Sequence, residues 1–139
     1  MRIMGIDYGD SRVGIAISDP LMFMAQGLKT IPNKVYSKML ASVVDIANEY
    51  EISTIVIGLP KNMDGTLGFR ADITKDFAKD LENEISGVTI IFQDERLTTV
   101  QASGILNVTN TRGKSRKGVI DTVAAEIILQ SYLDSNKNS

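Results

Sequence analysis

The stretch MGIDYGDSRVGIAI, residues 4–17, predicts a β-hairpin near the start of the chain. Two apolar β-favouring runs, one around Ile6 and one from Val13 to Ile17, are separated by DYGDSR. The glycine and aspartates of DYGDSR suit a tight turn. The hairpin therefore places an acidic side chain, that of Asp7, where the first strand runs out into the turn.

Downstream of the hairpin, short apolar runs alternate with segments whose apolar residues recur at helical spacing. The predicted strands are LKTI at 28–31, TIVIGLP ending at Gly58, and VTIIFQDE at 88–95, and the predicted helices span 37–50, 71–85, 97–106 and 117–133. A helix followed by a buried strand is typical of α/β proteins. The order β-β-β-α-β-α-β-α-α predicts an α/β fold whose mixed sheet has an antiparallel hairpin at its edge, parallel inner strands and covering helices.

Length and composition favour one ordinary folded unit. The 139 residues correspond to the usual size of one domain, and 43% hydrophobic with 23% charged residues is close to the globular average. We expect one domain over residues 1–139, with the tail DSNKNS at 134–139 frayed. The N-terminus lacks the pattern of a secretion signal and no run is long enough to span a membrane, so we expect a cytoplasmic protein with no membrane partner.

The chain contains no cysteine and no histidine, which excludes several kinds of chemistry. Disulfides, thiolate nucleophiles and zinc-thiolate sites need cysteine, and imidazole bases, His-ligated metals and Ser-His-Asp triads need histidine. Catalysis must therefore rest on carboxylates, Lys, Arg, Tyr or a metal ion. The net charge of -2 and a pI of about 5.1 argue against a uniformly basic surface that coats nucleic acid. The binding partner has to be inferred from local clusters of charged residues instead.

Four acidic residues lie at positions where a site could form. Asp7, Asp94 and Glu95 each end a predicted strand, and the loops beyond strand ends are where ligands bind in open α/β sheets. Asp7 could instead cap the turn, and Asp94 and Glu95 could simply begin the next helix. Side chains alternate along a strand, so only one of the adjacent pair can enter a shared site.

Asp121 lies on the apolar side of its predicted helix. At 100° per residue it aligns with Ala125 and Ile128, whereas Thr122, Glu126 and Gln130 form a polar face. A charge turned toward a sheet costs several kcal/mol unless it is paired or coordinated, which favours a functional carboxylate over a solvated one. Without histidine or cysteine, carboxylates from two strand ends and one helix favour Mg²⁺ or Mn²⁺.

The chain resembles the YqgF (RuvX) family of Holliday-junction resolvases, a branch of the RNase H-like nucleases. The matching segments, in chain order, are GIDYGDSRVGIAISDP at 5–20, GLPKNMDGTLGFRA at 58–71, QDERLTT at 93–99 and KGVIDTVAAEIILQSYLD at 117–134. The resemblance implies an RNase H-like fold with a five-stranded mixed sheet flanked by helices. It also implies metal-dependent phosphodiester hydrolysis on Asp7, the acidic pair Asp94 and Glu95, and Asp121, acting on a four-way DNA junction or on precursor 16S rRNA. Within the pair we expect Glu95 to be the ligand, with Asp94 as the reserve acid.

Several polar and basic residues are candidate nucleic-acid contacts. Ser11 stands where many relatives carry Lys, but the following Arg12 remains. The other candidates are Asn62 and Thr66 in the loop 60–68, Arg70 and Arg96 nearby, and Arg112, Lys114, Arg116 and Lys117 in the basic segment 109–118. We expect that segment to move in the free protein and to become ordered on nucleic acid. The loop could instead be an ordinary connection, Arg70 and Arg96 could each pair with a neighbouring acid, and the basic segment with Lys117 could be solvated surface.

Two other functions stay open at this point. The chain could be a catalytically weak RNA- or ribosome-binding module, or a nucleotide-binding ATPase of the actin and sugar-kinase type, whose phosphate hairpin GIDYGDSRVG would also fit. Such ATPases close two domains around the nucleotide, and this chain has room for one. Resolution of a junction requires two active sites, whereas trimming one RNA end requires one, so we expect a monomer or a weak homodimer.

Overall fold

The computed structural model describes residues 2–9, 11–19, 21, 24–59, 69–94 and 115–137, without the side chains of 69–70, 94, 115–121 and 136–137. The strands are β1 (Arg2–Tyr8), β2 (Arg12–Ser18), β3 (Ala25–Pro32), β4 (Ile52–Leu59) and β5 (Thr89–Asp94), and the helices are α1 (Tyr36–Glu49), α2 (Phe69–Glu84) and α4 (Ser115–Lys137). The predicted helix 97–106 lies outside the described residues. In the described part of the chain, no helix is both long enough and apolar enough to cross a membrane.

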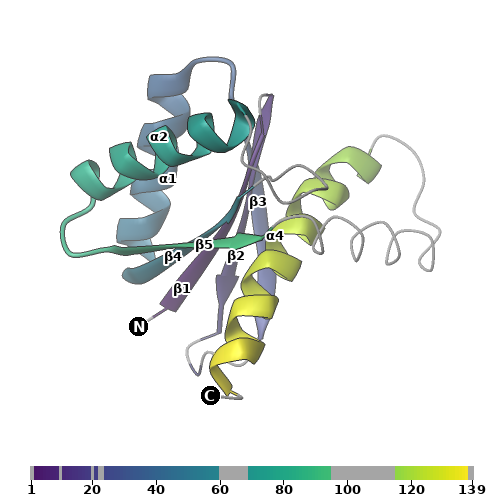
Figure 1. Cartoon of the computed structure of the whole chain (residues 1–139). Coiled ribbons are helices and arrows are strands. Elements are labelled where there is room, and N and C mark those ends of the chain that lie inside the picture. Colours follow the sequence, from purple (N-terminus) through teal and green to yellow (C-terminus); the bar gives the residue numbers. More distant parts are fainter. Residues whose placement is uncertain are drawn as a thin grey trace.

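One five-stranded mixed sheet in the order β3-β2-β1-β4-β5 organises the chain (Figure 1). The pairs β1–β2 and β2–β3 are antiparallel, and the pairs β1–β4 and β4–β5 are parallel. The predicted antiparallel hairpin edge and parallel inner strands are confirmed. Because β1, β4 and β5 are parallel, their carboxyl ends lie at the same edge of the sheet.

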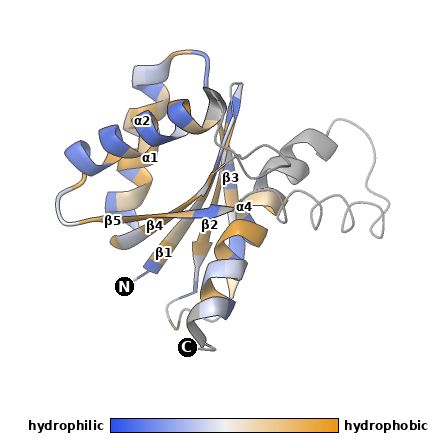
Figure 2. Ribbon diagram, viewed as in Figure 1, coloured by the Kyte–Doolittle hydropathy of each residue, from blue (hydrophilic) through white to orange (hydrophobic). Residues whose placement is uncertain are grey.

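Two apolar layers hold helices against the two faces of this sheet (Figures 1 and 2). The larger cluster packs α1 and α2 against Met4, Ile6 and other strand residues on one face. The smaller cluster packs α4 against Ile3, Ala16 and Val56 on the opposite face. Strand alternation explains the division, since successive residues of β1 point to opposite faces.

Strand β3 and helix α4 extend further than predicted. Strand β3 begins at Ala25 rather than at residue 28, because it pairs with β2 as far as Ser18 and Ala25. Helix α4 begins at Ser115 and continues through Lys137, past the predicted end at Leu133. Neither extension has a strong apolar pattern, and for β3 the pairing with β2 sets the start of the strand.

The apolar side of α1 is largely the predicted one. Of the predicted positions Leu40, Val43, Val44 and Ala47, Val43 and Ala47 are buried, together with Met39 and Ile46. Leu40 and Val44 pack at the margin of the cluster. For α2 the predicted face is confirmed, with Phe77, Ala78, Leu81 and Ile85 buried.

Candidate metal centre and nucleic-acid interface

Asp7 lies near the carboxyl end of β1 on the sheet face that α4 covers. Ile3 belongs to the apolar cluster under α4, and Asp7 shares its face because the two positions differ by an even number of residues. The neighbouring Tyr8 points to the other face and stacks on Phe77 of α2, with ring centroids 4.3 Å apart. Asp7 is half-buried, and its cross-strand partner Gly14 has no side chain to crowd the carboxylate.

Helix α4 passes directly over β1 at Gly5. A Cβ atom at Gly5 would lie 2.7 Å from Leu129 Cβ and 2.9 Å from the carbonyl oxygen of Ala125. This close approach requires glycine on the strand. The predicted packing of the Asp121 helix on the strands is confirmed here, since Ala125 is fully buried.

The direction of α4 relative to β1 follows from its contacts with β3. The backbone N–H of Ala25 donates to Gln130 Oε1 and that of Gly27 donates to Glu126 Oε1, both at 2.9 Å. Helix α4 therefore runs antiparallel to β3. Strand β3 runs parallel to β1, because each of them is antiparallel to β2.

The backbone of α4 at position 121 consequently lies toward the Asp7 end of β1. Position 121 is one helical turn before Ala125, which covers Gly5, and Asp7 is the next residue of β1 on that face. The side chain of Asp121 is not among those that the structure describes. The topology thus brings the two predicted acids to one end of one face.

Strand β5 brings the backbone of Asp94 to the same edge of the sheet. Its last residue, Asp94, pairs with Leu59 of the parallel strand β4. Ile91 packs with the cluster under α4, and Ile90 packs with the cluster under α1 and α2. Ile91 therefore points to the α4 face of the sheet and Ile90 to the opposite face. The side chain of Asp94 and the whole of Glu95 lie outside what the structure describes.

The turn that follows Asp7 is held by a residue that sequence reasoning missed, Asn33. The side-chain Nδ2 of Asn33 donates to the carbonyl oxygen of Gly9 at 3.0 Å, and its backbone N–H donates to that of Ser11 at 2.8 Å. Gly9 N–H donates to the carbonyl oxygen of Arg12 at 2.9 Å, and a Cβ at Gly9 would lie 2.6 Å from that oxygen. An asparagine after a strand resembles any loop residue, so the sequence carries no signal for this role.

The structure places Arg12 beside this turn, at the first position of β2, half-buried. The other predicted nucleic-acid contacts are described less fully. The backbones of Arg70, Arg116 and Lys117 lie in α2 and α4, and Asn62, Thr66, Arg96, Arg112 and Lys114 lie outside the described residues.

Among the residues whose side chains are described, no three acidic residues gather into a metal-binding group. Asp7 is the one predicted ligand in that part of the chain, and its half-buried carboxylate is a hard oxygen donor of the kind that Mg²⁺ and Mn²⁺ bind. The fit of the site to a divalent ion therefore rests on Asp7 and on the positions of the strand end and helix beside it.

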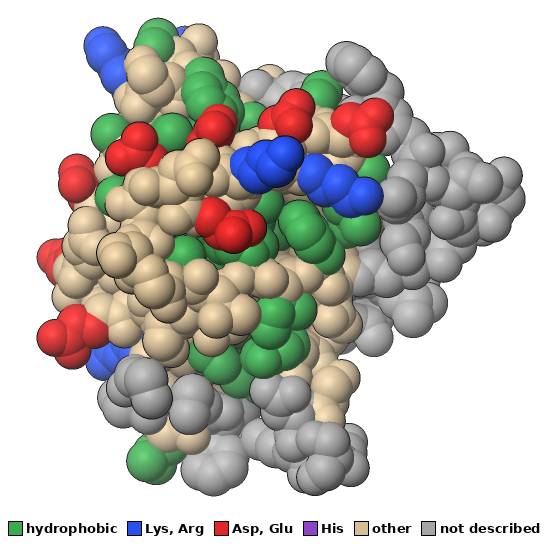
Figure 3. Space-filling view, turned by 60° about the vertical axis from the view of Figure 1, so that its left-hand side comes forward, with side chains coloured by type: hydrophobic (Ala, Val, Ile, Leu, Met, Phe, Trp, Pro, Cys, Tyr) green, Lys and Arg blue, Asp and Glu red, His purple; other side chains and the backbone are tan. Residues whose placement is uncertain are grey.

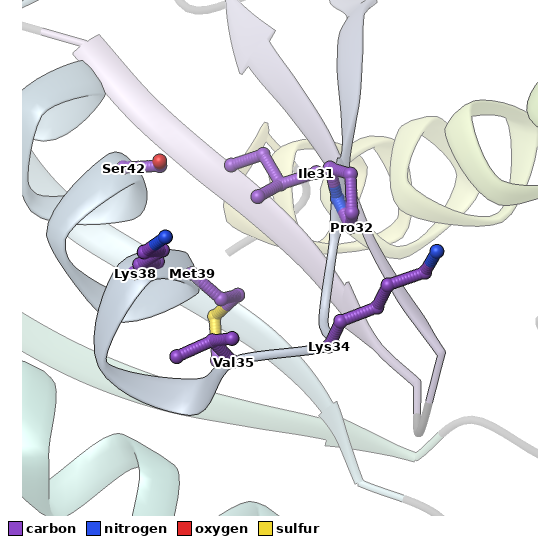
Figure 4. Close-up of a pocket in the computed structure, with 7 residues that line it drawn as sticks. All are labelled: Ile31, Pro32, Lys34, Val35, Lys38, Met39 and Ser42. Carbon is purple, nitrogen blue, oxygen red and sulfur yellow. The ribbon is translucent and has the colours of Figure 1, made fainter.

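A separate cavity of about 230 Å³ lies between the end of β3 and α1 (Figure 4). Its lining residues are Ile31, Pro32, Lys34, Val35, Lys38, Met39 and Ser42. Ile31 and Met39 belong to the core on the α1 side of the sheet, so this cavity opens on the face opposite to Asp7. It contains none of the predicted site residues.

The surface over the α1 and α2 side is not basic. Figure 3 shows Asp and Glu side chains spread across the visible face with Lys and Arg among them. The acidic residues of α2 include Asp72, Asp76 and Asp80. Such a mixed surface offers no continuous attraction to a phosphate backbone.

Two known proteins that share one name are similar to this chain over nearly its whole length. A "Putative pre-16S rRNA nuclease" of Ruminiclostridium cellulolyticum is 47% identical over an alignment of 143 positions, which covers 100% of both chains. A protein of the same name from Halothermothrix orenii is 48% identical, over 96% of this chain and 95% of its own.

Solved structures show the same fold at low sequence identity. The RuvC protein of T. thermophilus, solved in complex with a Holliday junction substrate, has a TM-score of 0.63 at 14% identity, covering 100% of this chain and 97% of its own. The Fowlpox virus resolvase, solved with Holliday junction DNA, has a TM-score of 0.56 at 16% identity, covering 98% and 99%. The RNase H-like fold implied by the sequence is thereby confirmed.

The sequence pattern of one protein family matches residues 1–135, nearly the whole chain. This match agrees with the names of the full-length relatives and with the fold. The chain belongs to the RuvX family, described as Holliday junction resolvases.

Proposed function

We propose that this chain is a nuclease that hydrolyses phosphodiester bonds in structured nucleic acid, with a divalent ion held by Asp7, Glu95 and Asp121. The observation that carries the proposal is the position of Asp7. It lies at the shared carboxyl edge of β1, β4 and β5, on the face covered by α4, in a member of a nuclease family. That edge is where ligands bind in sheets with parallel strands.

The choice of Glu95 over Asp94 follows from alternation along β5. Ile91 shares the α4 face with Asp7, and residues an even number of positions from Ile91 in an extended chain share its face. Position 95 meets that condition and position 94 does not. We therefore assign the ligand role to Glu95, with Asp94 as the reserve acid.

The roles of the chain's own groups follow from its composition. A bound Mg²⁺ or Mn²⁺ supplies an acidified attacking water and neutralises charge on the leaving oxygen, so no imidazole base is needed in a chain without histidine. The three carboxylates would hold the ion, and the hydrogen bonds of Gly9 with Arg12 and Asn33 hold the backbone that follows Asp7. Arg12 and the cations of 109–118 bind phosphates on the substrate.

The two candidate substrates are a four-way DNA junction and the precursor of 16S rRNA. The names of the relatives favour the RNA, and the description of the family favours the junction. A junction needs two sites in a dimer and an RNA end needs one, so the mass of the active species separates these uses. We further propose that the protein acts in the cytoplasm, where both substrates occur in bacteria such as the source organisms of these relatives.

The test is a cleavage panel with Mg²⁺ and Mn²⁺ on a four-way junction, duplex, single strand and precursor 16S rRNA. Asp7→Asn, Glu95→Gln and Asp121→Asn should abolish cleavage yet keep nucleic-acid binding, because affinity comes mainly from surface cations. Asp94→Asn is the matched control and should cut. Wild-type rates in all three neutralised variants would contradict the assignment.

Metal-dependent stability gives an independent measurement. Mg²⁺ or Mn²⁺ should raise the melting temperature of the wild type, and Asp7→Asn or Asp121→Asn should lose much of that response. ATP with Mg²⁺ should raise it no further than Mg²⁺ alone, since without a second domain the adenine and ribose have little to bury them. An ATP-specific increase would favour the ATPase, and binding without any metal-dependent cleavage would favour the binding module.

A further inference from the structure

Two polar side chains of α4 bind the free edge of the sheet. Strand β3 is outermost, so the N–H groups of Ala25 and Gly27 that face away from β2 have no strand partner. Gln130 Oε1 accepts from Ala25 and Glu126 Oε1 accepts from Gly27, each at 2.9 Å. We call these two contacts the edge latch. Gln130 is oriented in turn by its Nε2, which donates to Asp134 Oδ1 at 3.0 Å.

The spacing of the edge latch fixes the position of α4 along its own axis. Alternate residues of a strand are separated by about 6.7 Å, and residues one turn apart on a helix by about 6.0 Å, so both contacts can form together. A slide of α4 would lengthen both bonds. The apolar contacts under α4 have no comparable directionality, since burial depends on area rather than on alignment.

The approach at Gly27 shows how closely the edge latch is built. A Cβ atom on Gly27 would lie 2.6 Å from Glu126 Oε1 and 3.1 Å from Thr122 Cβ. An added Cβ would therefore push the Glu126 carboxylate away from the strand backbone at this position. The same helix meets Gly5 of β1 through Ala125 and Leu129, so α4 is located against the sheet at two separate glycines.

From these contacts we propose that Glu126 and Gln130 are positioning residues of the metal site, which hold Asp121 at the correct distance from Asp7. The inference rests on the proposed function. Asp121 is one turn from Ala125 on the face over β1, and Glu126 is adjacent to Ala125 on the face over β3. Rotation or sliding of α4 therefore changes both the edge latch and the separation of the two acids.

The tolerance of such a site makes this positioning consequential. Mg²⁺ binds oxygens at about 2.0–2.1 Å in near-octahedral geometry, and a working site needs its ligands within about 0.5 Å of their places. A helix held by apolar packing alone can shift by that amount. The edge latch removes this freedom at the turn that follows Asp121.

The experiment compares Glu126→Met and Gln130→Met, which remove the acceptor, with Glu126→Gln, which keeps a side-chain oxygen. Cleavage of a four-way junction and of precursor 16S rRNA is measured over a Mn²⁺ titration. We expect kcat to fall about tenfold or more in the methionine variants and the Mn²⁺ midpoint to rise, while KM stays within about twofold. Glu126→Gln should recover most of kcat. Glu82→Met, at an exposed glutamate of α2, is the control and should match the wild type.

Amide hydrogen exchange reports on the edge latch itself. Exchange at Gly27 should accelerate in Glu126→Met and return toward the wild-type rate in Glu126→Gln. Faster exchange at Gly27 with unchanged kcat and an unchanged Mn²⁺ midpoint would overturn the positioning role while leaving the nuclease intact. A wild type with no metal-dependent cleavage would instead refute the proposed function, and the positioning role with it.

Discussion

Replacing Gly5 by alanine should test whether the distance between α4 and β1 governs both stability and activity. The added Cβ would lie 2.7 Å from Leu129 Cβ, and 3.4 Å is where ordinary contact begins, so α4 must retreat by roughly 0.7 Å (3.4 − 2.7). The obstructing atoms are a Cβ and a backbone carbonyl oxygen, neither of which can rotate away. Overpacking of this kind costs about 1–3 kcal/mol of the free energy of unfolding.

The same displacement should reduce catalysis. Helix α4 carries Asp121 and β1 carries Asp7, so a retreat of α4 separates the two proposed ligands. A misplacement of about 1 Å at a reacting centre can cost about 100-fold in rate. We therefore expect kcat of Gly5→Ala to fall between about tenfold and 100-fold at saturating Mg²⁺, while junction binding without metal is retained.

Urea unfolding and single-turnover cleavage of a four-way junction measure the two effects. The matched control is Gly87→Ala, in the turn between α2 and β5, where φ is +78° and nothing lies within 4 Å of the new Cβ. Its left-handed backbone should cost about 1–2 kcal/mol of stability. Cleavage by this control should stay at the wild-type rate. Equal kcat in Gly5→Ala and Gly87→Ala, with both folded, would refute the link between helix position and the metal site.

Two further predictions concern the basic segment and the contact between the helices of the other layer. Replacing Lys114 and Arg116 by Gln should weaken binding to all nucleic-acid sequences alike and reduce the slope of log affinity against log salt by about one unit per lost phosphate contact. Unchanged binding at low salt would mean that the basic segment is only solvated surface. Tyr36 of α1 donates its hydroxyl to Asp80 of α2, and burial, this hydrogen bond and the negative charge of Asp80 together raise the pKa of Tyr36. The pKa of Tyr36 in the folded protein exceeds the unfolded value of about 10. The stability that the Tyr36 hydroxyl contributes is therefore complete below pH 10 and is lost as the pH rises from there toward the folded pKa. Tyr36→Phe should lose less stability than the wild type between pH 9 and 11 in urea unfolding, and equal losses would contradict the role of the phenol.

The sequence by itself determined the hairpin, the alternation of helices and strands and the family. The buried strand around Ile55 to Ile57 and the helix bearing Phe77 and Leu81 bury what their periodicity predicts, because apolar area is read directly from side-chain type and spacing. The candidate acid Asp7 was found in the same way, at a strand end before a turn. Glu95 and Asp121 as its partners stay predictions, since their side chains lie outside the described part of the chain.

Only the tertiary structure decided what the polar residues of α4 and β3 do. Periodicity marks Glu126 and Gln130 as a polar face, but it cannot distinguish a face turned to water from one that accepts hydrogen bonds from a strand edge. Asn33 is a similar case, because it follows β3 whereas its hydrogen-bond partner Gly9 follows β1, far away in sequence. Hydrogen bonds depend on which unpaired backbone groups the folded sheet presents at each position, and that is known only once the strands are ordered in space.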